Sequence, residues 1–371
     1  GGAYRKWYGN REFVVNWAED GKEIKDMKPK SVVRSPSLYF KESVTWSEIT
    51  SSWKSFRFNE SGSISDVKGQ SAYYSSKEKL ISALCWLNSN VVEFLTKIQN
   101  PTLSFQSGDY KNLPLPVLGT SVVSLGKSAI SICEKDWNAF ESSSRFLTSP
   151  LHCLSDSLET SFEVYCSEAK ESTLRLKSLE EEINEIAVSK FELQSDIKTE
   201  VYLEQLTLKV NPAYRYGVKG TEEECNIRFR EDTMAELVSY AIGCMMGRYS
   251  LDELGLIYAN SGNEGFDASR YTKFPADDDG IIPLTDKEWF ADDAANRLVE
   301  FISVAWDKAH LEENLDFLAA NLSPKKGEDS RDTIRRYLCD KFYKDHMQTY
   351  KKRPIYWLFS SGKQKAFQCL V

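Results

Sequence analysis

The sequence RKWYGNREFVVNW, at residues 5–17, sets the character of the first domain. It places three cations, two tryptophans, a tyrosine and two asparagines around a single glycine, and its triplet Phe13-Val14-Val15 is β-prone. Arg and Lys neutralise phosphates, Trp and Tyr stack on bases, and Asn pairs with an adenine edge. The same residues also suit an aromatic-rich strand with a hairpin turn at Gly9-Asn10 and solvated cations. The run therefore predicts either a surface for a polyanion or the structural start of a β-rich domain.

Short β-prone pieces follow between residues 32 and 75, and turn-forming residues separate them. The simplest assembly is a small, twisted, mostly antiparallel sheet. From Lys77 to Pro101 the pattern changes to helical spacing, carried by Leu80, Leu84, Leu87, Val91 and Leu95. We therefore predict a helix that covers one face of the sheet.

The rest of the chain has helical periodicity. An apolar seam over residues 158–186 predicts one long amphipathic helix, in which the carboxylates of Glu180, Glu181 and Glu182 form a solvated face. Further helices are predicted over residues 234–246, 292–309, 313–321 and 332–350. The fold class is thus α+β, with a β-rich domain at residues 1–116, a helical spacer at 117–208 and a C-terminal helical domain at 209–371.

Charge is distributed unevenly along the 371 residues, whose net charge is −8. Residues 1–116 contain 16 Lys and Arg against 12 Asp and Glu, residues 117–319 contain 19 against 38, and residues 320–371 contain 12 against 5. Because local potential steers a polyanion, the two basic ends are candidate nucleic-acid contacts, and the acidic middle should face solvent or a protein.

Composition argues against several other classes. The eight cysteines are scattered without a Cys-x-x-Cys pair, and only three histidines accompany them, so we expect no metal and a reducing cytoplasm. The longest apolar runs are too short for a membrane helix. Asn211-Pro212-Ala213-Tyr214 is similar to a base-holding motif, but we interpret it as a turn. We predict no catalytic residues in this chain.

Three further blocks point to a family. They are PTLSFQSGD at residues 101–109, SYAIGCMMGRYS at 239–250 and RPIYWLFSSG at 353–362. Together with the opening run, and in the same order, they resemble segments of the PglX proteins, the adenine-specific DNA methyltransferases of BREX phage-defence systems. The order of β-rich block, helix and the segment at 105–116 also resembles methyltransferase target-recognition domains.

This resemblance implies a fragment of a longer enzyme that lacks the methyltransferase core. S-adenosylmethionine is then the cofactor of the full-length parent, not of this fragment, and the partners are double-stranded DNA and the core of the same parent chain. The candidate DNA-binding residues are Arg5, Lys6, Trp7, Tyr8, Asn10, Arg11, Lys54, Arg57 and Lys68. The alternative is a protein-interaction scaffold, whose acidic middle binds other defence-system proteins or whose basic surface accepts a DNA-mimicking inhibitor.

Overall fold

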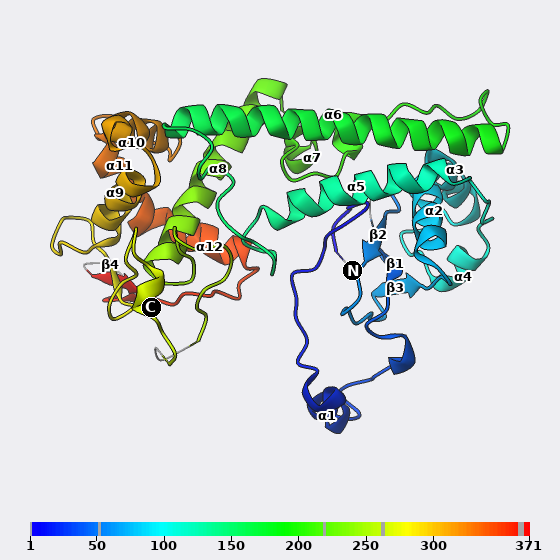
Figure 1. Ribbon diagram of the computed structural model, residues 1–371, viewed down its shortest axis with the longest axis horizontal. Coiled ribbons are helices and arrows are strands. Elements are labelled where there is room, and N and C mark those ends of the chain that lie inside the picture. The colour runs from blue at the N-terminus through cyan, green and yellow to red at the C-terminus, as the bar shows by residue number, and fades with distance from the viewer. Residues whose placement is uncertain (1, 51–52, 218–219, 261–263, 363–366) are drawn as a thin grey trace. The chain divides into compact units, whose positions relative to one another are not determined.

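The computed structural model describes residues 2–50, 53–217, 220–260, 264–362 and 367–371. They form two compact units (Figure 1). Unit 1 comprises residues 1–137 and 170–218, and unit 2 comprises residues 138–169 and 219–371. This division differs from the three segments expected, because helices of the predicted spacer pack with the elements that precede and follow them.

A three-stranded antiparallel sheet lies at the centre of unit 1. Its strands are β1 (Ser43–Ser47), β2 (Phe56–Asn59) and β3 (Gly69–Ala72), in the order β2-β1-β3. Val44 is paired with Phe58 on one side and with Ala72 on the other. The predicted small antiparallel sheet is confirmed, although the β-prone pieces at 32–33 and 38–40 form loop and 3-10 helix instead.

Helices cover this sheet, as predicted, but the helix expected over residues 77–101 is two helices. α2 (Lys77–Leu87) ends at Asn88, and α3 (Asn90–Gln99) begins directly afterwards. The backbone becomes extended at Ser89, and beside this break the Asn88 side chain accepts a hydrogen bond from the Phe56 N–H and donates one to the Phe56 carbonyl, both at 3.0 Å. Further helical elements of unit 1 are α4 (Ser107–Lys111), α5 (Ser121–Asn138), the C-terminal part of α6 (Leu158–Lys190), η2 (Leu203–Gln205) and α7 (Pro212–Tyr216).

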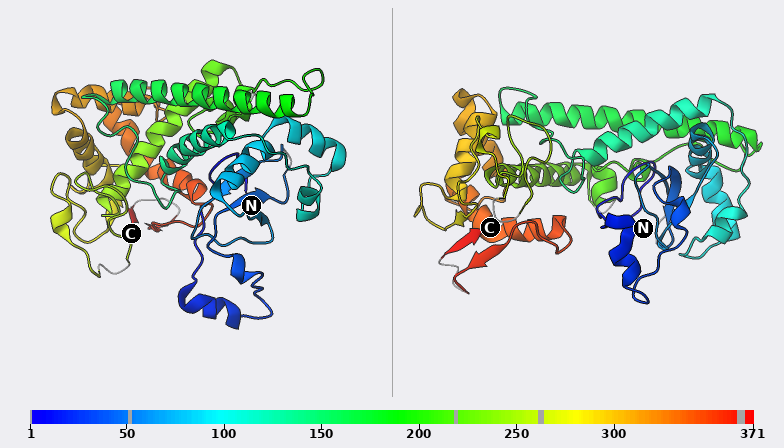
Figure 2. Two further views of the ribbon diagram at one scale, coloured as in Figure 1. Left: turned by 45° about the vertical axis from the view of Figure 1, so that its right-hand side comes forward. Right: turned by 60° about the horizontal axis from the view of Figure 1, so that its bottom comes forward.

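An arm at residues 10–42 leaves the sheet and returns to it. It carries α1 (Ala18–Asp26) and η1 (Pro36–Leu38), and α1 stands apart from the sheet in Figure 1 and in the left view of Figure 2. Its small core is the Trp17 ring, which packs edge-on against Tyr39 at 5.2 Å and Phe40 at 6.2 Å. Gly21 fits beneath this ring at a φ of +72°, where an added Cβ would lie 2.8 Å from the indole.

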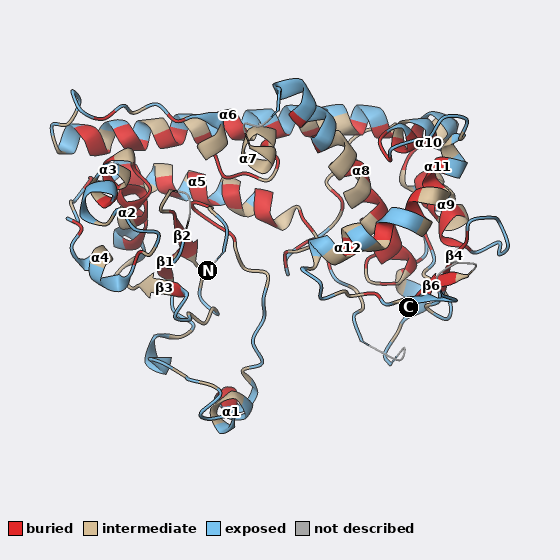
Figure 3. Cartoon of the chain, turned by 180° about the vertical axis from the view of Figure 1, so that it is seen from behind, coloured by how far each residue is buried: buried red, intermediate tan, exposed pale blue. Residues whose placement is uncertain are grey.

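Unit 2 is mainly helical. It contains α8 (Glu222–Met245), α9 (Ala294–Ala305), α10 (Leu311–Ala320), α11 (Ser330–Tyr337), the π-helix η6 (Leu338–Phe342), α12 (Tyr343–Thr349), and short 3-10 turns at η4 (Ala268–Arg270) and η5 (Lys308–His310). A second antiparallel sheet, which we did not predict, has the order β4-β6-β5, with β4 (Ile282–Leu284), β5 (Leu358–Ser360) and β6 (Gln368–Leu370). Figure 3 shows the buried faces of these helices.

The cysteines, the possible metal ligands and the helix lengths bear on disulfide, metal and membrane-spanning functions. All eight cysteines carry free thiols. Among the described residues, no His, Cys, Asp or Glu side chains gather in a group that could hold a metal ion. Within the part of the chain that the structure describes, no helix combines the length and the apolar composition that a membrane-spanning helix needs.

Candidate nucleic-acid interface

The opening run contacts the edge of the sheet at Trp7, which forms an isolated parallel bridge with Arg57 of β2. The Trp7 N–H donates to the Phe56 carbonyl at 2.9 Å, and the Phe58 N–H donates to the Trp7 carbonyl at 2.7 Å. Trp7 and Tyr8 are each 1% exposed. Both rings are therefore part of the core and are not accessible for stacking on a base.

Arg5 is buried in an ion pair with Asp136 of α5. Its Nη1 lies 3.2 Å from the Asp136 carboxylate, which also accepts the N–H groups of Lys209 at 2.9 Å and Val210 at 3.0 Å. The guanidinium lies over the Trp137 ring at 5.0 Å. One buried carboxylate thus joins the opening run, α5 and the segment before α7.

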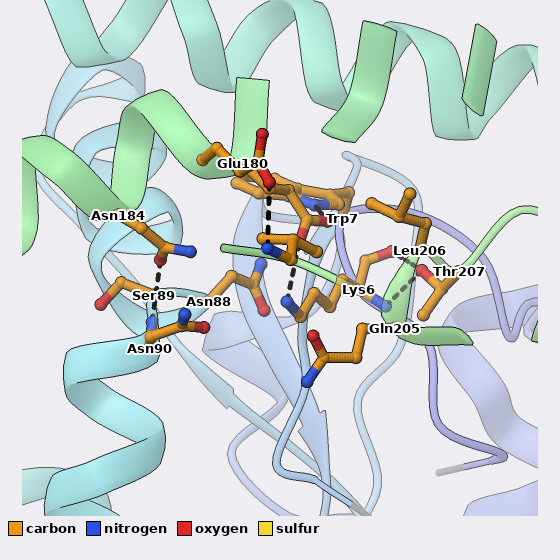
Figure 4. A network of polar contacts seen from close by, with 12 residues as sticks. Lys6, Trp7, Asn88, Ser89, Asn90, Glu180, Asn184, Gln205, Leu206 and Thr207 are labelled. Carbon is orange, nitrogen blue, oxygen red and sulfur yellow. Dashed lines mark hydrogen bonds and ion pairs between the residues drawn. The ribbon is translucent and has the colours of Figure 1, made fainter. Parts of the chain in front are cut away.

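Lys6 is buried beside Glu180 of α6 (Figure 4). The Lys6 Nζ and the Trp7 Nε1 each lie 2.8 Å from a different oxygen of this carboxylate. The Lys6 backbone N–H donates to Thr207 Oγ1 at 3.0 Å. Burial alone would lower the pKa of Lys6, but the Glu180 charge outweighs it and holds that pKa above its ordinary value.

Arg57 completes the buried set. Its Nη1 donates to the Arg5 carbonyl at 3.1 Å and its Nη2 donates to Ser47 Oγ at 3.2 Å. Burial and the neighbouring Arg5 charge lower the pKa of Arg57 to about 10, so the side chain stays charged at neutral pH.

Five of the nine predicted contacts, Arg5, Lys6, Trp7, Tyr8 and Arg57, are therefore buried inside unit 1. In this structure they offer no surface to a phosphate or a base, and we reassign them to the framework. The physical reason is that two of the cations pair with carboxylates of helices far away in the sequence. Asp136 pairs with Arg5 and Glu180 pairs with Lys6, and the local sequence reveals neither contact.

The other four predicted residues lie at the surface, but each already has a partner. Asn10 donates to the Ala3 carbonyl at 2.9 Å, and Lys54 donates to the Thr102 carbonyl at 3.0 Å. Ion pairs join Arg11 to Glu60 at 2.9 Å and Lys68 to Glu48 at 3.0 Å. DNA contact by these four side chains stays a prediction.

Asn211 and Tyr214 use their polar atoms within the fold. The Asn211 Oδ1 accepts from the Ala213 N–H at 3.2 Å and caps α7, while its Nδ2 donates to the carbonyls of Leu203 at 2.7 Å and Leu206 at 2.9 Å. The Tyr214 hydroxyl donates to the Tyr4 carbonyl. The turn that we predicted here is the start of a short helix.

Sequence reasoning passed over another group of cations. Residues 27–41 contain Lys28, Lys30, Arg34 and Lys41 and no Asp or Glu, and all four side chains are exposed. The signal is present in the sequence as a basic stretch without acids, but its first part is also typical of an ordinary solvated loop.

Comparison with known proteins identifies relatives of the whole chain. No family model matches it. It is 41% identical over 382 residues to the adenine-specific methyltransferase BrxX of Escherichia coli O9:H4 (strain HS), and 36% identical over 391 residues to the adenine-specific methyltransferase PglX of Lacticaseibacillus casei (strain Zhang). Both matches cover 100% of this chain but only 31% and 30% of the relatives. The resemblance to PglX-type proteins is thus confirmed, and the chain is homologous along its whole length to one part of the adenine-specific methyltransferases BrxX and PglX.

Proposed function

We propose that this chain is the target-recognition and C-terminal region of an adenine-N6 DNA methyltransferase that acts in BREX phage defence. The observation that carries the proposal is the match of the entire chain to about 30% of two adenine-specific methyltransferases. In this proposal the fragment reads double-stranded DNA, and the rest of the parent protein performs the methyl transfer in the cytoplasm.

The architecture of unit 1 supports a reading role. A small sheet, buttressed by helices and by two buried ion pairs, is a rigid platform from which loops can project. Rigid elements suit DNA recognition because phosphate contacts must fix the register before a few side chains can read base edges. The exposed or half-exposed Asn10, Arg11, Lys54 and Lys68 lie on this platform and remain candidate contacts.

A flipped adenine does not fit the Asn211 to Tyr214 segment, which resembles a base-holding motif. Asn211 would have to offer its side-chain amide to an adenine amino group, yet that amide caps α7 and donates to two backbone carbonyls. We therefore expect the cofactor and the flipped base to be held by the remainder of the full-length protein.

An exchange of segments tests the proposal. Residues 1–218 are replaced, in the full-length enzyme, by the matching part of a homologue that methylates a different sequence. The methylated sequence, mapped by long-read sequencing, should follow the exchanged segment. Exchange of residues 220–371 is the matched control and should leave the target sequence unchanged. An active chimera that keeps the original target after the first exchange would refute the assignment.

The scaffold alternative rests on the acidic residues 117–319, whose 38 Asp and Glu exceed their 19 Lys and Arg. Such a surface favours a basic protein partner over DNA. Salt dependence separates the two functions, because DNA affinity falls steeply with ionic strength in proportion to the phosphates neutralised.

A further inference from the structure

A basic ribbon, residues 27–41, forms the returning half of the arm in unit 1. Its cations are Lys28, Lys30, Arg34 and Lys41, and it contains no carboxylate side chain. All four cations are exposed, and within the described residues none of them lies in an ion pair. Four positive charges within fifteen residues therefore remain uncompensated along this segment.

Neighbouring lysines differ in this respect. On α1, Lys22 pairs with Glu19 at 3.4 Å and Lys25 pairs with Asp20 at 2.6 Å. Just beyond the ribbon, Glu42 forms an ion pair with Lys77 at 2.7 Å. The arm therefore separates its charges: acids and their lysines lie on α1, and unpaired cations lie on the ribbon. Such a separation concentrates positive potential on one segment.

The ribbon has a defined backbone. The Lys30 N–H donates to the Met27 carbonyl at 2.9 Å, and the Leu38 N–H donates to the Ser35 carbonyl at 3.0 Å. Its end is tied to the loop before β3, since the Phe40 N–H donates to the Ser63 carbonyl at 2.9 Å. The Trp17 ring, in the outgoing half of the arm, packs against Tyr39 and Phe40. The four cations are thus presented on a folded support attached to the sheet.

Apolar side chains accompany the cations along the ribbon and are also open to solvent. Val32 is 70% exposed, Met27 50% and Phe40 44%. Interleaved cations and apolar groups suit a nucleic-acid groove, where cations meet phosphates and apolar groups meet sugars, thymine methyls or base steps. The same composition would also suit an anionic lipid surface. DNA is favoured over a lipid surface because the chain is homologous to part of two adenine-specific methyltransferases.

We propose that the basic ribbon is the surface by which this region grips the DNA backbone, with Lys28, Lys30, Arg34 and Lys41 as phosphate contacts. This inference rests on the proposed DNA-reading function and moves the backbone contact from the buried cations Arg5, Lys6 and Arg57 to the basic ribbon. Phosphate contacts carry no sequence information, so the ribbon contributes affinity and register, and base readout belongs to other loops of unit 1.

The test uses the full-length enzyme with all four cations replaced: Lys28→Gln, Lys30→Gln, Arg34→Gln and Lys41→Gln. Affinity for cognate and scrambled duplexes should fall together. The slope of log affinity against log salt should shrink by about 0.9 for each phosphate that the variant no longer neutralises, hence by about 3.6 if all four cations bind B-DNA. The matched control removes four other exposed lysines of unit 1 with the same change of charge, Lys79→Gln, Lys111→Gln, Lys127→Gln and Lys190→Gln, and should change the slope by less than about one.

Several outcomes overturn the inference. If the ribbon variant keeps the affinity and salt slope of the wild type while the exchange of residues 1–218 still redirects methylation, the ribbon fails and the proposed function survives. If that exchange does not redirect methylation, the proposed function itself fails. Equal losses of affinity in ribbon and control variants would show a general charge effect. Loss of binding to vesicles of one part phosphatidylserine to three parts phosphatidylcholine, with DNA binding unchanged, would identify a lipid contact.

The pair Lys30→Gln and Arg34→Gln alone provides a milder variant should the fourfold change disturb folding.

Discussion

Replacement of Glu180 by Gln should destabilise unit 1 strongly. The carboxylate lies 2.8 Å from the Lys6 ammonium and 2.8 Å from the Trp7 indole nitrogen, and the side chains of Lys6 and Glu180 are only 9% and 3% exposed. Glutamine has nearly the same shape and can still accept from Trp7. It cannot neutralise Lys6, whose charge would remain buried without a partner.

The expected loss of stability is large because the Lys6 ammonium would be buried away from water and would also lack a carboxylate partner. Removal of one member of a buried ion pair costs about 3–5 kcal/mol. An exposed pair would contribute about 0–1 kcal/mol, so the magnitude itself reports whether the pair is buried. Glu182→Gln is the matched control, since Glu182 is exposed on the same helix two residues further on.

Native-state hydrogen exchange of the full-length protein measures this loss locally. Peptides that cover β2 and α6 report the free energy of opening of this part of the fold. A loss of about 3–5 kcal/mol should accelerate exchange of the most protected amides by at least about a hundredfold, because about 1.4 kcal/mol corresponds to a factor of ten. The control should leave exchange unchanged.

A second variant separates the effect of the buried charge from the effect of the missing ion pair. Lys6→Met combined with Glu180→Gln removes both charges and should recover most of the stability, since buried pairs can be replaced by neutral groups at little cost. If Glu180→Gln stays within about 1 kcal/mol of Glu182→Gln, the pair is effectively solvated. If the double variant is less stable than Glu180→Gln alone, the proposed cause of the instability is incorrect.

Two predictions concern unit 2. Burial raises the pKa of Glu141 to about 7, against the Ser239 hydrogen bond and the Arg248 charge, which lower it. The folded state therefore holds this proton more tightly than the unfolded state, whose carboxyl pKa is 4.5, so the contribution to stability is full below pH 4.5 and is lost as pH rises through 7. Between pH 4.5 and pH 8, thermal unfolding of the wild type should lose about 3 kcal/mol relative to Glu141→Gln, and parallel pH profiles would refute the burial of this carboxyl. His346 is buried and its Nε2 accepts two backbone N–H groups at 3.1 and 3.4 Å. His346→Phe should cost about 2–3 kcal/mol in denaturant unfolding and His346→Gln less, because Gln offers an acceptor; equal losses would mean that only ring packing matters.

Local sequence patterns predicted the longest helix and the first sheet, but not the second sheet. The long seam predicted a helix over residues 158–186, and α6 spans Leu158–Lys190. Short β-prone pieces and turn residues predicted an antiparallel sheet in the first domain, and β1 to β3 form it. Both signals are local, since a helix or strand must repeat its apolar residues at a spacing set by its own backbone. The break between α2 and α3 lies at Ser89, where the backbone is extended, and the apolar periodicity continues across it without a signal.

The Glu180-Glu181-Glu182 run shows where a local interpretation stops. We predicted that all three carboxylates lie on a solvated face. Successive residues of a helix point about 100° apart, so a run of three cannot share one environment. Glu182 is exposed, Glu181 is half-buried, and Glu180 turns inward to meet Lys6. Composition identified a charged run, but the burial of one member depends on a cation 174 residues away.

The same reasoning distinguishes the opening run from the basic ribbon. Arg5 and Lys6 lie in a segment as rich in cations and aromatics as any DNA-binding surface, yet Asp136 and Glu180 neutralise them inside the fold. A buried cation with a carboxylate partner has no remaining charge for a phosphate, whereas an exposed cation without one attracts polyanions at a distance. The basic ribbon has four such exposed cations, and it contains no Asp or Glu. The search for a DNA contact in this region therefore depends less on where cations are abundant than on where the fold leaves them unneutralised.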